Sequence, residues 1–211
     1  MSSLRKGLLL AGMLTALVLA AGMVTLAAPG DVLFQDDFSA GLDNWYLDSG
    51  TGGTPDNFFV DPDAKAMVFD PVGFGNAFAG DENWTDYAVE ADVIIREYPQ
   101  YGNFRFFLRM NELWYGYGVS FLADGAMIFR FDGNWDVREI LGEVWDAKAG
   151  IPLDTLTHVR VEVRGNQLAI FVNGEQVAQV EDPEAVYPAG RIGFRFDFVR
   201  GEVRNVKVTA L

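Results

Sequence analysis

The chain of 211 residues contains no cysteine and a single histidine, His158. Without cysteine there are no disulfide bonds and no lipid attachment through a cysteine side chain, so the core alone must hold the fold together. One histidine excludes a metal site built from several histidines. A Ser-His-Asp triad is also disfavoured, because no serine lies in a nucleophile-elbow sequence.

Basic residues are scarce relative to acidic ones, with 16 Lys and Arg against 30 Asp and Glu and a net charge of −14. A surface with this charge repels the phosphates of nucleic acids and of anionic lipids. We therefore expect no nucleic-acid partner. We interpret the acidity as a means of staying soluble in an extracellular or salty medium.

Only one long apolar run is present, and it lies near the N-terminus. Arg5 and Lys6 precede an uncharged stretch of 22 residues (7–28) that ends in small residues. This order is typical of a secretory signal peptide, so we expect residues 1–27 to be removed and residues 28–211 to form the mature domain. The run is also long enough for an uncleaved membrane anchor, which would be the only part of the chain to contact a membrane. Both alternatives predict a secreted or cell-surface protein.

The clearest structural signal lies between Leu156 and Val180. Valines at every second position alternate with polar residues, as in a strand with one buried face. Gly165-Asn166 and Asn173-Gly174 are two-residue turn signals, so the segment predicts three antiparallel strands. The first turn sets a register in which three apolar pairs share one face: Val159 with Val172, Val161 with Ile170, and Val163 with Leu168.

Short alternating segments recur along the rest of the chain, and no helical period appears outside the N-terminal run. The expected strands are residues 66–70, 74–79, 87–96, 104–110, 115–122, 126–132, 135–141, 191–198 and 202–209. Residues 48–63 are rich in Gly, Asp and Pro and are expected to form a loop. About a dozen strands at this spacing predict one all-β domain, a two-sheet antiparallel sandwich or a barrel.

Several segments follow one another in a recognisable order. They are F-Q-D-D-F-S-A-G-L-D-N-W from residue 34, F-F-L-R-M-N-E-L-W-Y-G-Y-G from residue 106, V-N-G-E-Q-V from residue 172, G-R-I-G-F-R-F from residue 190 and V-R-N-V-K-V from residue 203. Together they resemble the concanavalin A-like lectin/glucanase superfamily, in the laminin-G-like jelly-roll form of exported bacterial proteins. The resemblance covers residues 33–210 and implies two curved antiparallel sheets with any sugar on the concave face. It is less specific for function, since that superfamily includes lectins, binding modules, glucanases and structural domains.

Outward-pointing residues of the expected strands indicate where a sugar would bind. Arginine forks and carboxylates can hydrogen-bond pairs of sugar hydroxyls, and aromatic rings at strand ends can stack on a sugar. We expect the ligand-binding residues to be Arg105, Arg109, Trp114, Tyr115, Arg130, Trp135, Arg195 and Asp197. Arg109 is the residue that we expect to contact a ligand most directly. The alternative is that these charges form only a solvated surface paired across strands.

Glu90 and Asp92 are the candidates for catalysis. They lie two residues apart on one expected strand and therefore share a face. Their carboxyls could approach the separation of about 5–5.5 Å found in retaining glycosidases. Laminarinase-type glucanases of the superfamily carry a further Glu after this Glu-x-Asp, whereas Ile94 and Ile95 stand at that place here. The missing proton donor favours a domain without this catalysis.

Asp36 and Asp37 could offer oxygen ligands to calcium, although turn roles are favoured for them. We expect no other cofactor. The sequence thus predicts an exported, non-catalytic domain that binds an oligosaccharide or polysaccharide. The alternatives are a glycan-processing hydrolase of the same fold, including a keto-sugar hydrolase, and a structural or adhesive surface domain.

Overall fold

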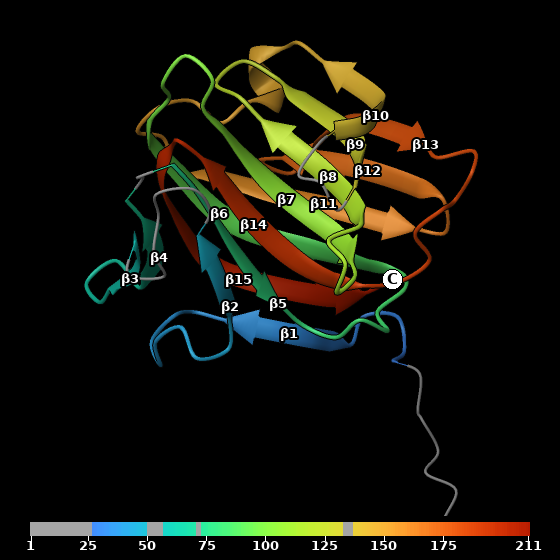
Figure 1. The fold of residues 1–211 in the computed structure, drawn as a ribbon, viewed down its shortest axis with the longest axis horizontal. Helices are drawn as coiled ribbons and strands as arrows, with labels where there is room; N and C mark the ends of the chain where they lie inside the picture. Colours follow the sequence, from blue (N-terminus) through green and yellow to red (C-terminus); the bar gives the residue numbers. More distant parts are fainter. Residues whose placement is uncertain (1–26, 50–56, 71–72, 133–136) are drawn as a thin grey trace, which may run out of the picture.

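The computed structural model describes residues 27–49, 57–70, 73–132 and 137–211. It confirms the all-β prediction, with two antiparallel sheets packed face to face (Figure 1). Among these described residues, helical structure is limited to short 3-10 turns such as Ala147–Ala149. The expected signal or anchor segment lies outside the described residues. Within the described ranges, no helix is long and apolar enough to cross a membrane.

One sheet has eight strands and contains the predicted three-stranded segment at one edge. In spatial order it comprises β13 (Glu175–Glu181), β12 (Gln167–Val172), β11 (Thr157–Arg164), β6 (Tyr87–Glu97), β15 (Arg200–Ala210), β4 (Ala66–Phe69) and β3 (Phe58–Asp61), and β1 (Val32–Asp36) also pairs with β15. The register between β11 and β12 is the predicted one, with Val159 opposite Val172 and Val163 opposite Leu168. Turn chemistry and the apolar pattern therefore determine this part of the fold together.

The second sheet has seven strands. In spatial order it comprises β10 (Val137–Val144), β9 (Ala126–Phe131), β8 (Gly116–Phe121), β7 (Asn103–Met110), β14 (Arg191–Asp197), β5 (Phe74–Ala79) and β2 (Tyr46–Ser49). Neighbours in space are often distant in sequence, as where β14 lies between β5 and β7. This arrangement is visible in Figure 1, where the red β14 runs beside the green β7.

The main core fills the space between the two sheets. Every second residue of β11 and β12 contributes to it, and so do Phe104, Phe106, Phe194 and Phe196 of the seven-stranded sheet. Phe106 and Phe194 meet edge to face with ring centroids 5.0 Å apart, an arrangement that aromatic pairs prefer. Burial on this scale explains how the domain holds together without disulfide bonds.

The prediction of a loop at residues 48–63 is wrong at both ends, because Tyr46–Ser49 forms strand β2 and Phe58–Asp61 forms strand β3. Phe58 lies in the core against Phe69, with ring centroids 4.8 Å apart. Tertiary packing of one aromatic side chain thus outweighs the surrounding Gly, Asp and Pro.

Candidate functional site

The seven-stranded sheet has an outer face, turned away from the core, that carries part of the predicted ligand-binding set. Arg105 and Arg195 lie opposite each other on β7 and β14, and Ser120 and Asn76 are their partners on the flanking strands. Two residues further along the same strands, Asp197 lies opposite Asn103. We call Asp48, Asn76, Asn103, Arg105, Ser120, Arg195 and Asp197 the polar cluster.

The two arginines of the polar cluster share one carboxylate. Arg195 donates from Nε to Asp197 Oδ1 at 2.6 Å, and Arg105 Nη2 lies 3.1 Å from Oδ2. The second contact is an ion pair outside hydrogen-bond geometry, which leaves Oδ2 without a hydrogen bond. Both guanidinium groups are largely buried, and burial lowers the pKa of each below its ordinary value while Asp197 opposes the shift. Arginine stays charged under these conditions.

The remaining members complete this network. Arg105 Nε and Ser120 Oγ both donate to Asn103 Oδ1, at 2.8 and 3.0 Å. Arg195 also donates to Asn76 Oδ1 at 3.2 Å, and its guanidinium lies 3.9 Å from the centre of the Phe74 ring. The arginines are therefore engaged by protein groups, so the network fixes strands β5, β7 and β14 relative to one another.

Next to the polar cluster, aromatic rings close the outer face. Phe78, Phe107 and Phe129 lie in one row across β5, β7 and β9, separated by Gly193 and Gly118. A Cβ atom at either glycine would lie 2.4 Å from the neighbouring Phe78 or Phe129 ring, so only glycine fits there. The three rings are almost fully buried. This row therefore offers no open trough for a ligand.

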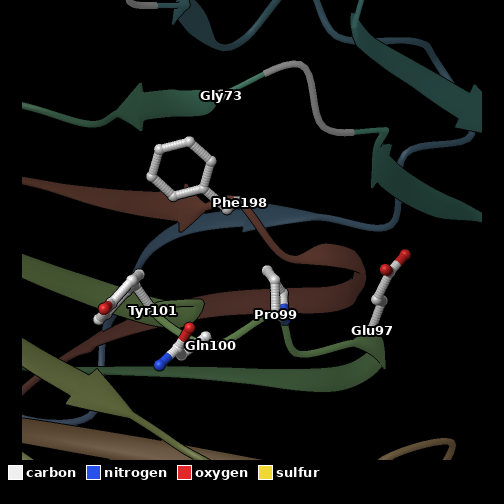
Figure 2. A pocket seen from close by; sticks show the side chains of 6 residues that line it. All are labelled: Gly73, Glu97, Pro99, Gln100, Tyr101 and Phe198. Carbon is white, nitrogen blue, oxygen red and sulfur yellow. The ribbon is translucent and has the colours of Figure 1, made fainter.

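An open pocket lies instead at one end of the sandwich, with a volume of about 480 Å³. Its lining residues come from the end of β6 and the segment that follows it, from the β14–β15 turn and from the residue before β5: Gly73, Glu97, Pro99, Gln100, Tyr101 and Phe198. We call this set the end pocket. In Figure 2, Phe198 lies beside Gly73, and Glu97, Pro99, Gln100 and Tyr101 lie across from them.

Local turn chemistry builds one wall of the end pocket. The backbone N–H of Gly102 donates to Pro99 O at 2.8 Å, which closes a turn between β6 and β7. Gln100 and Tyr101 occupy its corner, and the Tyr101 side chain is 78% exposed. A Cβ atom on Gly102 would lie 2.6 Å from Pro99 and 2.9 Å from Val199, so glycine permits the close approach of the two turns.

Phe198 forms the opposite wall in an unusual backbone conformation. Its φ is +58°, in the left-handed region that costs non-glycine residues free energy. Its N–H donates to Gly73 O at 2.8 Å, and 52% of its surface is exposed. Strained, exposed aromatic residues are uncommon in a connection that needs only two residues, and such strain is concentrated at functional sites.

The polar cluster and the end pocket adjoin each other along the chain. Asp197 precedes Phe198, Gly73 precedes Phe74, and Asn103 donates from Nδ2 to Tyr101 O at 3.5 Å. The charged network therefore anchors the strand ends from which the pocket walls emerge. Pre-ordering of this kind reduces the entropy that ligand binding would otherwise cost.

The predicted outward position of Arg109 is wrong. Arg109 has a φ of +50° and is only 3% exposed. It donates to Thr85 O and Gly165 O at 2.8 and 2.7 Å, and to Asp86 Oδ1 at 2.9 Å. The left-handed backbone at the end of β7 interrupts the alternation, so the side chain ties three segments together instead of facing a ligand.

Arg130 is also misplaced by the prediction. Its buried guanidinium pairs with Asp182, and with Glu139 and Glu184 at 2.6 and 3.0 Å. Burial opposes the ionisation of Asp182, but hydrogen bonds from Arg130 and Tyr117 outweigh it and lower the pKa of Asp182 to about 2. This ion pair lies on the core-facing side of β9, so it closes that end of the core.

The aromatic candidates are distributed differently from the prediction. Trp114 lies on the outer face, edge to face with Phe78 at 4.7 Å and with the Arg191 guanidinium 6.0 Å from its centre. Arg191 begins β14 whereas Asp197 ends it, so Trp114 is far along the strand from the end pocket. Tyr115 packs against the main core. Trp135 lies outside the described residues.

Glu90 and Asp92 do not join the arginines of the polar cluster. Both lie on β6 of the other, eight-stranded sheet. Glu90 pairs with Arg160 at 3.2 Å, and Asp92 Oδ1 lies 2.8 Å from His158 Nδ1. They belong to a charged surface paired across strands, which was the alternative stated for such residues.

Asp36 and Asp37 have turn contacts. Asp36 accepts hydrogen bonds from Phe38 N at 2.7 Å and Trp45 Nε1 at 3.0 Å. Hydrogen bonds from Ser39 lower the pKa of Asp37, which keeps its carboxylate ionised. In the part of the chain that the structure describes, no group of three or more His, Asp or Glu side chains could hold a metal ion.

Sequence reasoning missed the end pocket. It assigned no role to Glu97, Gln100 or Tyr101. It extended the expected strand 191–198 through Phe198, whereas β14 ends at Asp197 and the Phe198 side chain is about half exposed. The available signal was an aromatic residue in a tight turn between two strands where glycine or asparagine is usual.

Comparison with solved structures shows the same fold in glycan-related proteins. The carbohydrate-binding module CBM66 from Bacillus subtilis has a TM-score of 0.65 and 17% identity, covering 80% of this chain and 97% of the module. A β-glucanase from Bacillus licheniformis has a TM-score of 0.64 and 10% identity, covering 86% and 99%. A lichenase from a mouse hindgut metagenome has a TM-score of 0.63 and 13% identity, covering 84% and 99%. These likenesses confirm the predicted concanavalin A-like jelly roll.

At the level of sequence, a search of curated proteins found no match. A family model for the 3-keto-alpha-glucoside-1,2-lyase-like domain matches residues 32–209, which span nearly the whole described domain. The chain therefore belongs to the 3-keto-alpha-glucoside-1,2-lyase-like domain family, with the jelly-roll fold of carbohydrate-binding and glycan-active domains.

Proposed function

We propose that this chain is an exported, non-catalytic carbohydrate-binding domain that takes a short oligosaccharide or a chain end in the end pocket. The observation that supports this most is the pair of exposed aromatic side chains, Tyr101 and Phe198, on opposite walls of an open pocket. Aromatic faces opposite each other can pack on the apolar faces of a sugar ring.

The polar groups of the pocket support the same proposal. Gln100 offers an amide donor and acceptor, and Glu97 offers a carboxylate that accepts hydrogen bonds from paired hydroxyls. A volume of about 480 Å³ lies in the range of small-ligand sites. The aromatic row beside the polar cluster is closed and leaves no long groove there. Binding of an internal segment of a polysaccharide is therefore the less favoured alternative.

The absence of catalysis in this proposal rests on the pocket lining. Among the lining residues that the structure describes, Glu97 is the one carboxylate. Hydrolysis by the common glycosidase mechanism requires two, one as acid and one as nucleophile or base. Asp197 is nearby in sequence, but its carboxylate is buried between two arginines.

A glycan array on residues 28–211 tests binding, and a reducing-sugar assay on the bound glycans tests for product. We expect binding without product. Tyr101→Ala should weaken binding by at least about fivefold, since a stacked ring contributes roughly 1 kcal/mol. Tyr46→Ala is the matched control, because Tyr46 is also exposed but lies on β2 away from the pocket. Equal loss in both variants, or none in either, would exclude the end pocket as the binding site.

Family membership favours a second candidate, a lyase that acts on a 3-keto-α-glucoside. In such a reaction a base removes the proton from C2, and the electron pair left on C2 forms the C1=C2 double bond. The C1–O bond breaks at the same time, and the oxygen of the released aglycone takes up a proton. Glu97 is the residue that could serve as the base. A 4-nitrophenyl 3-keto-α-glucoside would report this activity by release of 4-nitrophenol, and Glu97→Gln should abolish the release.

A further inference from the structure

We infer that the end pocket prefers non-acidic sugars, neutral or amino-bearing, and binds uronic acids and sulfated or sialylated glycans more weakly. The inference rests on the proposed glycan binding at this pocket. Its basis is the charge of the lining: Glu97 is the one ionisable acid or base among the lining residues that the structure describes, apart from the phenol of Tyr101. An acidic sugar would meet a carboxylate with no cation to compensate for it.

The arginines behind the pocket do not supply that cation. Arg105 and Arg195 are buried and share Asp197, and the nearby Asp48 further compensates the charge of Arg195. Within the polar cluster, the positive charges of Arg105 and Arg195 are therefore balanced by the negative charges of Asp48 and Asp197. Its hydrogen bonds are directed to protein groups, so a ligand in the pocket has no guanidinium to pair with.

Arg200 requires separate consideration, because it lies opposite Glu97 across the β6–β15 pair. Its side chain does not line the end pocket. It lines a separate hollow with Arg96 and Phe59 on the eight-stranded sheet, and its Nε lies 3.7 Å from Asp70. Arg96 is held by Asp154 and Glu202 at 3.1 and 2.9 Å. Arg96 and Arg200 therefore line this hollow and not the end pocket.

The overall charge acts in the same direction. A net charge of −14 lowers the encounter rate of anionic ligands at low salt. An exposed carboxylate next to the bound sugar adds a local contribution. An exposed pair of opposite charges tightens binding by about twofold to fivefold. An exposed pair of like charges is expected to weaken binding by about the same factor.

Calorimetric titration with three trisaccharides at equal ionic strength tests this selectivity. The probes are a neutral hexose trisaccharide, a glucosamine trisaccharide and a galacturonic acid trisaccharide. We expect the neutral and amino probes to bind, the amino probe about twofold to fivefold more tightly below its amine pKa, and the acidic probe to bind least. In the Glu97→Gln variant, the amino probe should bind no more tightly than the neutral probe. The difference in affinity between the neutral and acidic probes should become smaller.

The outcomes distinguish this inference from the function on which it rests. Acidic binding as tight as neutral binding would overturn the selectivity while leaving glycan binding intact. The same preference in wild type and Glu97→Gln would also overturn it, because the pocket carboxylate would then have no part in the choice. Failure of all three probes would overturn the proposed function and the inference with it. Arg200→Gln is the control and should leave the order of the probes unchanged.

Discussion

Replacing Phe198 with glycine separates the contribution of its ring to binding from its cost to the fold. Phe198 has a φ of +58° in the connection between β14 and β15, and about half of its surface is exposed. Glycine adopts this backbone conformation without steric cost and removes the ring completely. We therefore expect Phe198→Gly to fold as stably as the wild type and to lose glycan binding.

The expected stability change is the sum of three effects of similar size. Relief of the left-handed conformation stabilises the fold by about 1–2 kcal/mol. The greater freedom of glycine in the unfolded chain costs about 0.5–1 kcal/mol. Loss of the half-buried ring costs about 1 kcal/mol, half of the value for full burial. The net change should lie within about 1 kcal/mol of zero, which corresponds to about 2–4 °C in melting temperature.

Thermal unfolding and glycan titration of two variants test this reasoning. Phe198→Ala removes the ring but keeps the backbone strain, so it should melt below Phe198→Gly by an amount that corresponds to about 1 kcal/mol. Both variants should bind glycan at least about fivefold more weakly than the wild type. A drop of more than about 10 °C in the glycine variant would show that the ring is structural. Unchanged binding in both variants would show that Phe198 does not contact the ligand.

Three further predictions concern other parts of the molecule. Arg109→Ala should destabilise the domain by about 3–5 kcal/mol in urea unfolding, because it removes the cation paired with Asp86 and takes a donor from three backbone carbonyls. The depressed pKa of Asp182, about 2 against about 3.9 in the unfolded chain, stabilises the fold above pH 4. This contribution is lost as the pH falls through 2, so Asp182→Asn should show a flatter stability profile between pH 4 and pH 2. Mass spectrometry of the protein recovered from its host should find an N-terminus near Ala28, and recovery of an intact anchor from membranes would contradict signal cleavage.

The fold was largely predictable because its strongest signals are local. Asn173-Gly174 and Gly165-Asn166 specify tight turns, and the flanking valines specify which face is buried, so the register of β11 and β12 follows from the sequence. Strand β3 was not predictable in this way. Its four residues stand in a Gly-, Asp- and Pro-rich setting, and only the long-range contact of Phe58 with Phe69 makes them a strand.

The site was less predictable, because alternation within a strand says nothing about how the strand ends. Arg105, Arg195 and Asp197 were placed correctly on the outer face, since they lie within regular strands. Arg109 and Phe198 lie at strand ends and have positive φ. The left-handed backbone interrupts the alternation there, so the side chain no longer points to the face that the pattern predicts. A period of two therefore assigned the buried Arg109 to the ligand and continued a regular strand through the exposed Phe198.

Arg105 and Arg195, which suggested a sugar-binding face, have a structural role in this molecule. Two buried guanidiniums that share Asp197 are costly unless their hydrogen bonds are directed to fixed partners, and here they are. The result is a rigid junction of β5, β7 and β14, and each of these strands leads within two residues to a wall of the end pocket. The charged groups thus position the turns, and in the proposed binding mode the exposed groups of the turns meet the ligand. The inferred preference against acidic sugars has the same origin, because the cations that could attract them are already neutralised within the fold.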